Sequence, residues 1–152
     1  MTNVPSPNEI EISVFGPGIG EAIAFHYNNN WILIDSCIDQ KTNKPASLNY
    51  LQSLSVDLKT SVKLIILTHW HDDHIRGASE MIQKCPNARI VLSDALKNDD
   101  FLQLAVIYSK RKMVLPNGFD EFTKILQQIR DDDRDLKFGS VDKALFHDST
   151  DM

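Results

Sequence analysis

Cysteine is scarce in this chain, with only Cys37 and Cys85 among 152 residues. The two lie far apart and lack the close spacing of a metal-binding pair, which predicts reduced, mostly structural thiols in a reducing compartment. A basic excess is lacking too, since the formal net charge is −5. This balance argues against a generally basic surface for nucleic acid, although it leaves room for a local basic patch.

The sequence also lacks any run of about 20 apolar residues, the length needed to cross a bilayer. Residues 1–7 contain no basic segment followed by an apolar one, so no secretory signal is visible. We therefore expect a soluble, cytoplasmic protein with no membrane partner. At 152 residues the chain is long enough for one domain with a real core. We expect a flexible tail over residues 1–8 and that domain over residues 9–152.

Apolar runs and alternations predict strands, and apolar residues at helical spacing predict helices. The predicted strands are 9–15, 21–27, 31–37, 61–67, 88–93 and 144–147. The predicted helices are 45–57, 77–84, 96–112 and one that begins near residue 117 and stops at the acidic run 131–133. The order strand, helix, strand between residues 61 and 93 indicates an α/β fold with a right-handed crossover.

The segment Thr68–Gly77 concentrates residues that bind metals. His69, His71, Asp73 and His74 fall within six positions, directly after a short apolar run that reads as a buried strand. In extended chain, residues two apart point the same way, so His69 and His71 can face one ion. Asp73 and His74 can face a neighbouring position as the chain begins to coil. Imidazole and carboxylate suit zinc, or manganese or iron with less preference.

Other residues of this segment have a structural and a functional interpretation each. A polar turn that holds three histidines by chance is the structural alternative to a metal site. Trp70 would floor a substrate pocket or, as we favour, pack in the interior. Arg76 would contact an anionic substrate or form a surface ion pair, and Asp72 reads as a solvated spacer.

The pattern His69-x-His71-x-Asp73-His74 after a buried strand resembles the motif of the metallo-β-lactamase superfamily. The resemblance implies that His69 and His71 hold one metal ion, and that Asp73 and His74 hold a second. It gives Asp73 the further task of orienting the attacking hydroxide. Asp35, at the end of an early predicted strand, matches an aspartate of the family. It would orient a ligand histidine or the metal loop, or simply cap a turn.

The family fold is an αββα sandwich of two similar halves, and the resemblance covers the N-terminal half only. The remaining ligands of the family come from the second half, whereas only His147 lies downstream of the motif here. The chain therefore reads as a truncated member, and the role of His147 stays open. A sheet meant to pack on a second sheet would leave a large apolar face open, which favours association.

The resemblance implies a metal-dependent hydrolase in which an activated hydroxide attacks an ester-type substrate. A phosphoester is the first choice and a thioester or other ester the second. The alternative is a catalytically incomplete fragment that binds a metal or a partner, with a second copy or a complementing chain supplying the missing ligands. The glycine-rich segment 16–20 precedes a predicted strand, so a phosphate-cradling loop is disfavoured. A loop overhanging the active site and an ordinary turn remain equal interpretations of it.

Overall fold

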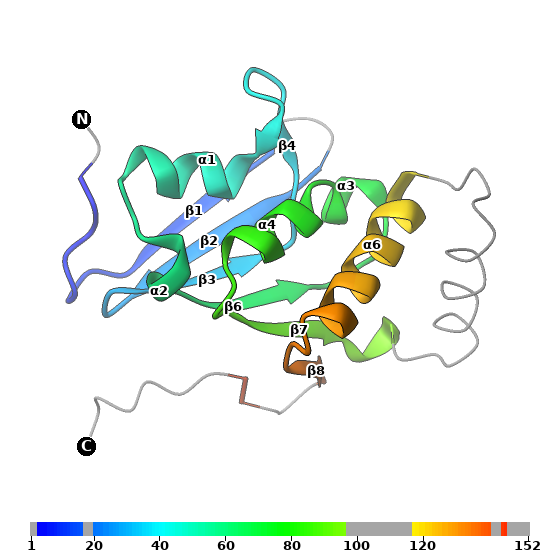
Figure 1. Cartoon of the computed structure of the whole chain (residues 1–152). Helices are drawn as coiled ribbons and strands as arrows, with labels where there is room; N and C mark the ends of the chain where they lie inside the picture. The colour runs from blue at the N-terminus through cyan, green and yellow to red at the C-terminus, as the bar shows by residue number, and fades with distance from the viewer. Residues whose placement is uncertain (1–2, 17–19, 97–116, 141–143, 146–152) are drawn as a thin grey trace.

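A computed structural model describes residues 3–16, 20–96, 117–140 and 144–145 (Figure 1). Its centre is a six-stranded mixed sheet in the order β1-β2-β3-β6-β7-β8. The first three strands pair antiparallel and the last three join in parallel. The strands are β1 (Glu11–Phe15), β2 (Ala22–Tyr27), β3 (Asn30–Ile34), β6 (Val62–Leu67), β7 (Arg89–Ser93) and β8 (Leu136–Gly139). Two short strands, β4 (Ile38–Asp39) and β5 (Lys44–Pro45), form a separate antiparallel pair.

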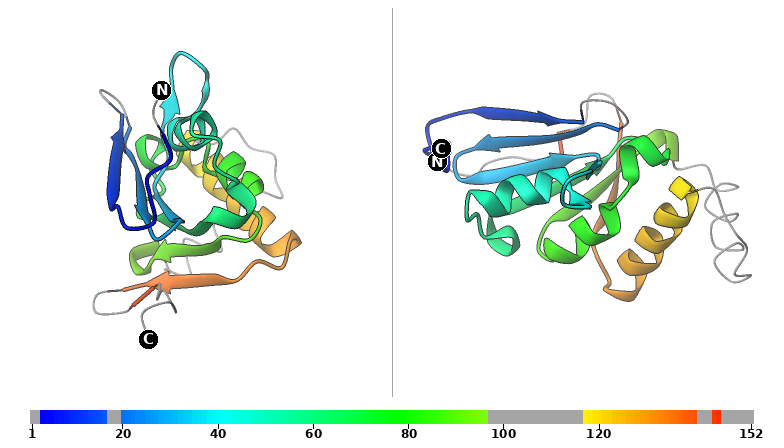
Figure 2. Two further views of the ribbon diagram at one scale, coloured as in Figure 1. Left: turned by 90° about the vertical axis from the view of Figure 1, so that its left-hand side faces the viewer. Right: turned by 90° about the horizontal axis from the view of Figure 1, so that it is seen from above.

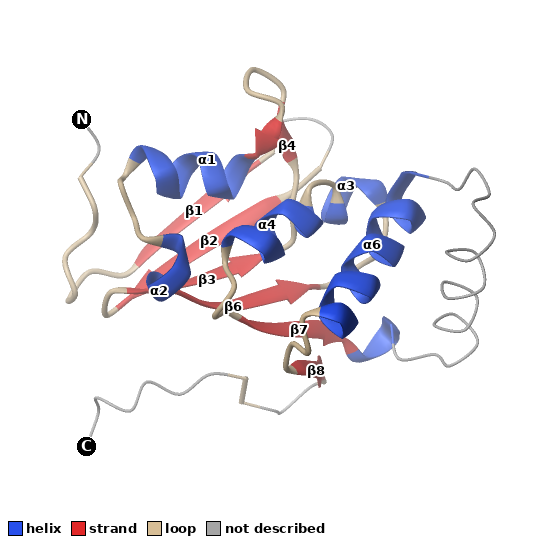
Figure 3. Ribbon diagram, in the orientation of Figure 1, coloured by secondary structure: helices blue, strands red, loops and turns tan. Residues whose placement is uncertain are grey.

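The described helices, blue in Figure 3, cover one face of this sheet, as the turned views in Figure 2 show. They are α1 (Ala46–Ser53), α2 (Leu58–Ser61), α3 (Asp72–Ile75), α4 (Ala78–Lys84) and α6 (Asn117–Asp131), with a 3₁₀ turn, η1, at Asp94–Leu96. None of the helices that the structure describes is long and apolar enough to span a bilayer. The cytoplasmic location stays a prediction.

The core lies between the helices and the inner face of the sheet. Alternate residues of the strands point inward, so Ala24, Trp31 and Leu33 are fully buried beneath the helices. The helices contribute an apolar stripe that includes Leu51 of α1 and Phe122 of α6, both with no exposed surface. This packing fixes the ends of β3 and β6, from which the candidate site emerges.

The outer face of the sheet is apolar and open among the described residues. Ile12 and Val14 of β1 remain 63% and 65% exposed, and they lie opposite Phe25 and Ile23 of β2 in the strand register. The face therefore continues across neighbouring strands, as expected for one half of a two-sheet sandwich.

Most predicted elements are present, with their ends shifted by one to three residues. The predicted helix 45–57 is wrong in extent, because α1 ends at Ser53 and Asp57 instead caps α2 by accepting from Lys59 N–H. The sequence analysis did not predict β8 (Leu136–Gly139). In the predicted strand 144–147, residues 144–145 lie outside any strand, and residues 146–147 lie outside the described part of the chain. Alternation over only four residues gave β8 too weak a signal.

The predicted helix 96–112 lies almost wholly outside the described residues, as does His147. The division into a flexible tail and one domain stays a prediction. Within the described part of that tail, Ser6 N–H donates to the Glu9 carboxylate and Asn28 N–H donates to the Pro7 carbonyl.

Candidate metal centre

The metal-binding segment leaves the carboxyl end of β6 and coils at once into the short helix α3. His71 has extended backbone angles and starts that helix, and its carbonyl accepts from the N–H groups of His74 and Ile75. Ile75 is fully buried and bridges to Ser36, which follows β3. The segment is thus held between the ends of two parallel strands, where loops of α/β sheets commonly carry function.

Three side chains converge at this edge of the sheet. Asp35, His69 and His74 each offer a ligand atom, and these atoms all lie within 4.8 Å of one another. Asp35 is 6% exposed, whereas His74 is half-buried and His69 exposed. The backbone of Asp35 has a φ of 55°, in the left-handed region that only Gly, Asn and Asp visit readily. That turn aims its carboxylate toward the metal-binding segment.

The carboxylate of Asp35 is the hub of the hydrogen bonds in this group. Its Oδ1 accepts from Thr68 N–H at 2.7 Å, and its Oδ2 accepts from the Thr68 hydroxyl and from His74 Nδ1 at 3.0 Å. Because an ionised carboxylate only accepts, His74 must carry its proton on Nδ1 in this bond. The Nε2 atom of a neutral His74 is then free of a proton and available to a metal.

Thr68 selects the tautomer of His69 in a similar way. The hydroxyl has one proton, which it donates to Asp35, so its 2.9 Å contact with His69 Nδ1 is one in which the histidine donates. His69 is thereby left with Nε2 as its acceptor atom. One buried carboxylate therefore selects, directly or through Thr68, the tautomers of two histidines. The sequence analysis missed Thr68; a hydroxyl residue directly before the first histidine was the available signal.

His71 and Asp73 lie outside this group of three. The ring of His71 is exposed and lies 4.5 Å from the Trp70 ring, with its own ring centre 6.2 Å from that of His69. The Asp73 carboxylate is 51% exposed and approaches His74 Nε2 at 3.7 Å. The structure therefore brings together two of the four predicted ligands with Asp35. That all four bind metal stays a prediction.

Residues just before β2 and just after β3 also form hydrogen bonds with the metal-binding segment. Glu21 N–H donates to the Asp73 carbonyl at 2.9 Å, and Ser36 N–H donates to the His74 carbonyl at 2.7 Å. A side chain at Gly20 would meet the Asp73 carbonyl oxygen at 2.9 Å, and Gly20 has a φ of 100°. Both facts require glycine at this position.

A hollow of about 570 Å³ adjoins the segment. Its lining residues are Val14, Phe15, Gly16, Gly20, Glu21, Asp73 and His74. Both ends of the glycine-rich segment border the hollow, which favours the interpretation of a loop beside the active site; residues 17–19 lie outside the described part.

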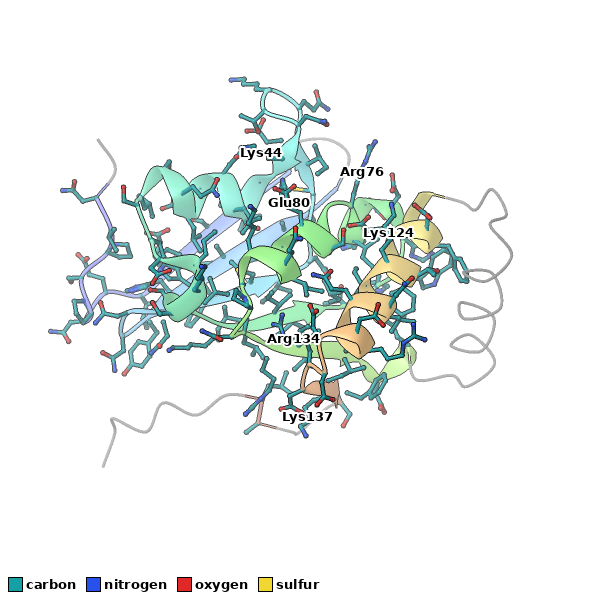
Figure 4. All side chains as sticks on the ribbon, viewed as in Figure 1. Lys44, Arg76, Glu80, Lys124, Arg134 and Lys137 are labelled. Carbon is teal, nitrogen blue, oxygen red and sulfur yellow. The ribbon has the colours of Figure 1, made fainter. Side chains whose placement is uncertain are left out.

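Trp70 and Arg76 of the motif make contacts of the kind expected from their structural interpretations. Trp70 is half-buried and packs edge-to-face on Phe119 of α6, with ring centres 6.1 Å apart. Arg76 lies 3.9 Å from the Asp72 carboxylate in an exposed ion pair and extends into solvent (Figure 4).

The two cysteines are free and buried. Burial raises the pKa of Cys37, and it raises the pKa of Cys85 to about 12. Thiols of this kind are poor nucleophiles and metal ligands near neutral pH, which agrees with a structural role.

Comparison with known proteins agrees with this geometry. Residues 15–146 match the family described as the metallo-beta-lactamase superfamily. The chain belongs to that superfamily, whose members commonly bind metal ions and include hydrolases.

Among curated proteins, the hydroxyacylglutathione hydrolase of Vibrio campbellii is 30% identical over 95 residues, which cover 53% of this chain and 36% of that protein. The chain thus spans about a third of this relative. A candidate metallo-β-lactamase from Thermotoga maritima has the same fold, with a TM-score of 0.53 at 16% identity over 91% of this chain and 61% of that one. The metallo-β-lactamase SMB-1 is similar over 53% of this chain and 29% of its own, with a TM-score of 0.41 and 24% identity.

Proposed function

We propose that this chain forms the metal-binding half of a metal-dependent hydrolase that cleaves an ester-type bond. The observation that carries the proposal is the convergence of His69 and His74 on Asp35, with hydrogen bonds at Nδ1 that leave Nε2 of both histidines as the acceptor atom. A chance arrangement of polar side chains would not be expected to place the proton on Nδ1 in both histidines.

The donor set fits zinc, with manganese or iron as alternatives, because imidazole nitrogens and a carboxylate lie at one edge of the sheet. We assign His69 and His71 to one ion and Asp73 and His74 to a second, with Asp35 holding His74 in place from behind. The ring of His71 and the carboxylate of Asp73 are exposed, so both side chains can change rotamer when an ion binds. A bound metal of this kind supplies Lewis acidity and lowers the pKa of a coordinated water.

Asp73 has a second task in the proposed reaction. Asp73 lines the hollow, and its carboxylate lies 3.7 Å from His74 Nε2. From that place it can accept a hydrogen bond from the attacking water and so point the oxygen lone pair at the substrate.

We now favour a thioester substrate over the phosphoester that the sequence alone favoured. Glu21 and Asp73 line the hollow together with the apolar residues Val14 and Phe15. The similarity to a hydroxyacylglutathione hydrolase supports the same choice.

Metal analysis of the purified chain tests the proposal first. We expect close to two zinc equivalents per chain and their loss in a His69→Ala/His71→Ala variant. Hydrolysis of a hydroxyacyl thioester of glutathione should then exceed hydrolysis of bis(4-nitrophenyl) phosphate. Zinc content equal to that of the double variant would overturn the proposal for this chain.

The open outer face of the sheet favours a second function, that of a partner-binding half-domain. Ile12 and Val14 are more than three-fifths exposed, and an apolar sheet face of this kind is stable only when covered. A second copy or a complementing chain would cover it and supply further metal ligands. Light scattering after gel filtration distinguishes the two: a monomer that holds two zinc ions excludes the need for such a partner.

A further inference from the structure

The first turn of α6 packs on the backbone of the metal-binding segment with no side chain between them. Gly118 is buried there. A Cβ atom built on it would lie 2.5 Å from the Trp70 carbonyl oxygen, 2.7 Å from the Asp72 nitrogen and 3.0 Å from the His71 carbonyl carbon. The first two distances are shorter than real Cβ atoms tolerate, so any other residue at 118 requires something to move.

Glycine at this position is not explained by local backbone geometry. The glycines with positive φ are Gly16, Gly20 and Gly77 among the described residues, whereas Gly118 is the second residue of α6. Glycine at position 118 therefore lets α6 approach the two peptide units that flank His71.

The body of α6 is anchored in the core. Glu121 Oε1 accepts from the N–H and the hydroxyl of Ser79 at 2.9 and 2.7 Å, which ties α6 to α4. Phe122 and Ile125 are fully buried in the core. A side chain at position 118 would therefore force the first turn of α6 and the peptide units around His71 apart.

We propose that Gly118 is a positioning residue for the metal centre: its missing side chain lets α6 set the position of His71 relative to His69 and His74. This inference rests on the proposed function, because it concerns the ligands assigned there. Gly118 touches neither metal nor substrate in this scheme and acts only through the segment Trp70–Asp72.

The test is a Gly118→Ala variant with Gly139→Ala as the matched control. A Cβ at Gly139 would meet only side-chain atoms, Val91 Cγ1 at 3.0 Å and Leu145 Cδ1 at 3.5 Å, which can shift by rotation. We expect Gly118→Ala to weaken zinc binding about tenfold or more in a competition titration with a chromophoric chelator. We also expect altered visible bands in its cobalt-substituted form, while Gly139→Ala matches the wild type in both. Zinc affinity within twofold of the wild type, with unchanged cobalt bands, would overturn the inference.

Two further measurements keep the inference decidable. If Gly118→Ala does not fold, Phe119→Leu removes the edge-on contact with Trp70 while nearly conserving volume, and it should weaken zinc binding severalfold; no change would contradict the inference. If the wild type binds no zinc, the proposed function fails by itself. Amide hydrogen exchange of the metal-free chain then decides: His74 and Ile75, whose N–H groups donate to the His71 carbonyl, should exchange faster in Gly118→Ala than in Gly139→Ala, and equal rates would refute the positioning role.

Discussion

The two ends of the metal-binding motif differ in how firmly the fold holds them. Asp35, Thr68 and His74 are tied together by hydrogen bonds beside the ends of β3 and β6. His71 and Asp73 have exposed side chains, which contact the Trp70 ring and approach His74 Nε2 at 3.7 Å, respectively. The difference teaches that the centre combines a rigid base with adjustable ligands. Substitutions in the base should therefore affect folding and metal together, and substitutions in the outer part should affect metal alone.

Asp35→Ala should have the largest effect, because it removes the shared acceptor of the base. Thr68 N–H and His74 Nδ1 would lose their partner in a nearly closed site, at a cost of about 2–3 kcal/mol in the free energy of unfolding. Zinc affinity should fall by about ten- to a hundredfold in parallel. Urea denaturation and zinc titration measure the two quantities. An Asp35→Ala chain as stable as the wild type would show that the base is not rigid.

The comparison between His74→Ala and His71→Ala is the sharpest test of the difference. Both should weaken zinc binding by a factor of about ten or more, because each removes an assigned ligand. Only His74→Ala should also lower the stability of the metal-free chain, by about 1 kcal/mol, since it breaks the bond to Asp35. Equal losses of stability in the two metal-free variants would contradict the distinction between a rigid base and adjustable ligands.

Thr68→Val tests the relay between Asp35 and His69. The substitution keeps the shape of the side chain but removes the hydroxyl, so His69 would no longer be held in one tautomer. We expect zinc affinity to fall severalfold, and we expect Thr68→Ser to restore it. The populations of the His69 tautomers are read from ¹⁵N chemical shifts of the ring. A fixed Nδ1–H tautomer in Thr68→Val would show that the hydroxyl has no part in the selection.

Arg76→Ala should have the smallest effect. Its guanidinium is 63% exposed and 3.9 Å from the Asp72 carboxylate, and exposed pairs of this kind contribute about 0–1 kcal/mol. Zinc affinity should stay within twofold of the wild type. A large loss of thioester hydrolysis with unchanged zinc binding would instead assign Arg76 to substrate binding.

Much of the fold could be predicted because its signals are local. The apolar run before His69 and the alternation along β2 each indicate a strand from a few neighbouring residues. The motif also located the candidate site, because four potential metal ligands within six positions are unusual. By contrast, β8 has only four residues, and its place beside β7 depends on α6 returning the chain to that edge. Short strands with long-range partners carry little sequence signal.

The prediction was weakest where distant segments meet. Asp35 approaches His74 across 39 positions, and only the family resemblance pointed to it. Gly118 reaches Trp70 across a longer separation, and nothing in a helical periodicity indicates close backbone contact. Thr68 lies next to the motif, yet its importance depends on Asp35 being within reach. Such residues are found from packing, because their role is defined by their neighbours in space.

The left-handed backbone of Asp35 limits which substitutions the site can accept. A φ of 55° admits Gly, Asn and Asp at small energetic cost, while the three bonds to its oxygens require a double acceptor. Glycine tolerates the positive φ but offers no acceptor, whereas glutamate offers two acceptor oxygens but does not tolerate the positive φ. Asparagine tolerates the positive φ and offers one acceptor oxygen. In a saturation library at this codon, therefore, survivors should be confined to aspartate with a minor fraction of asparagine.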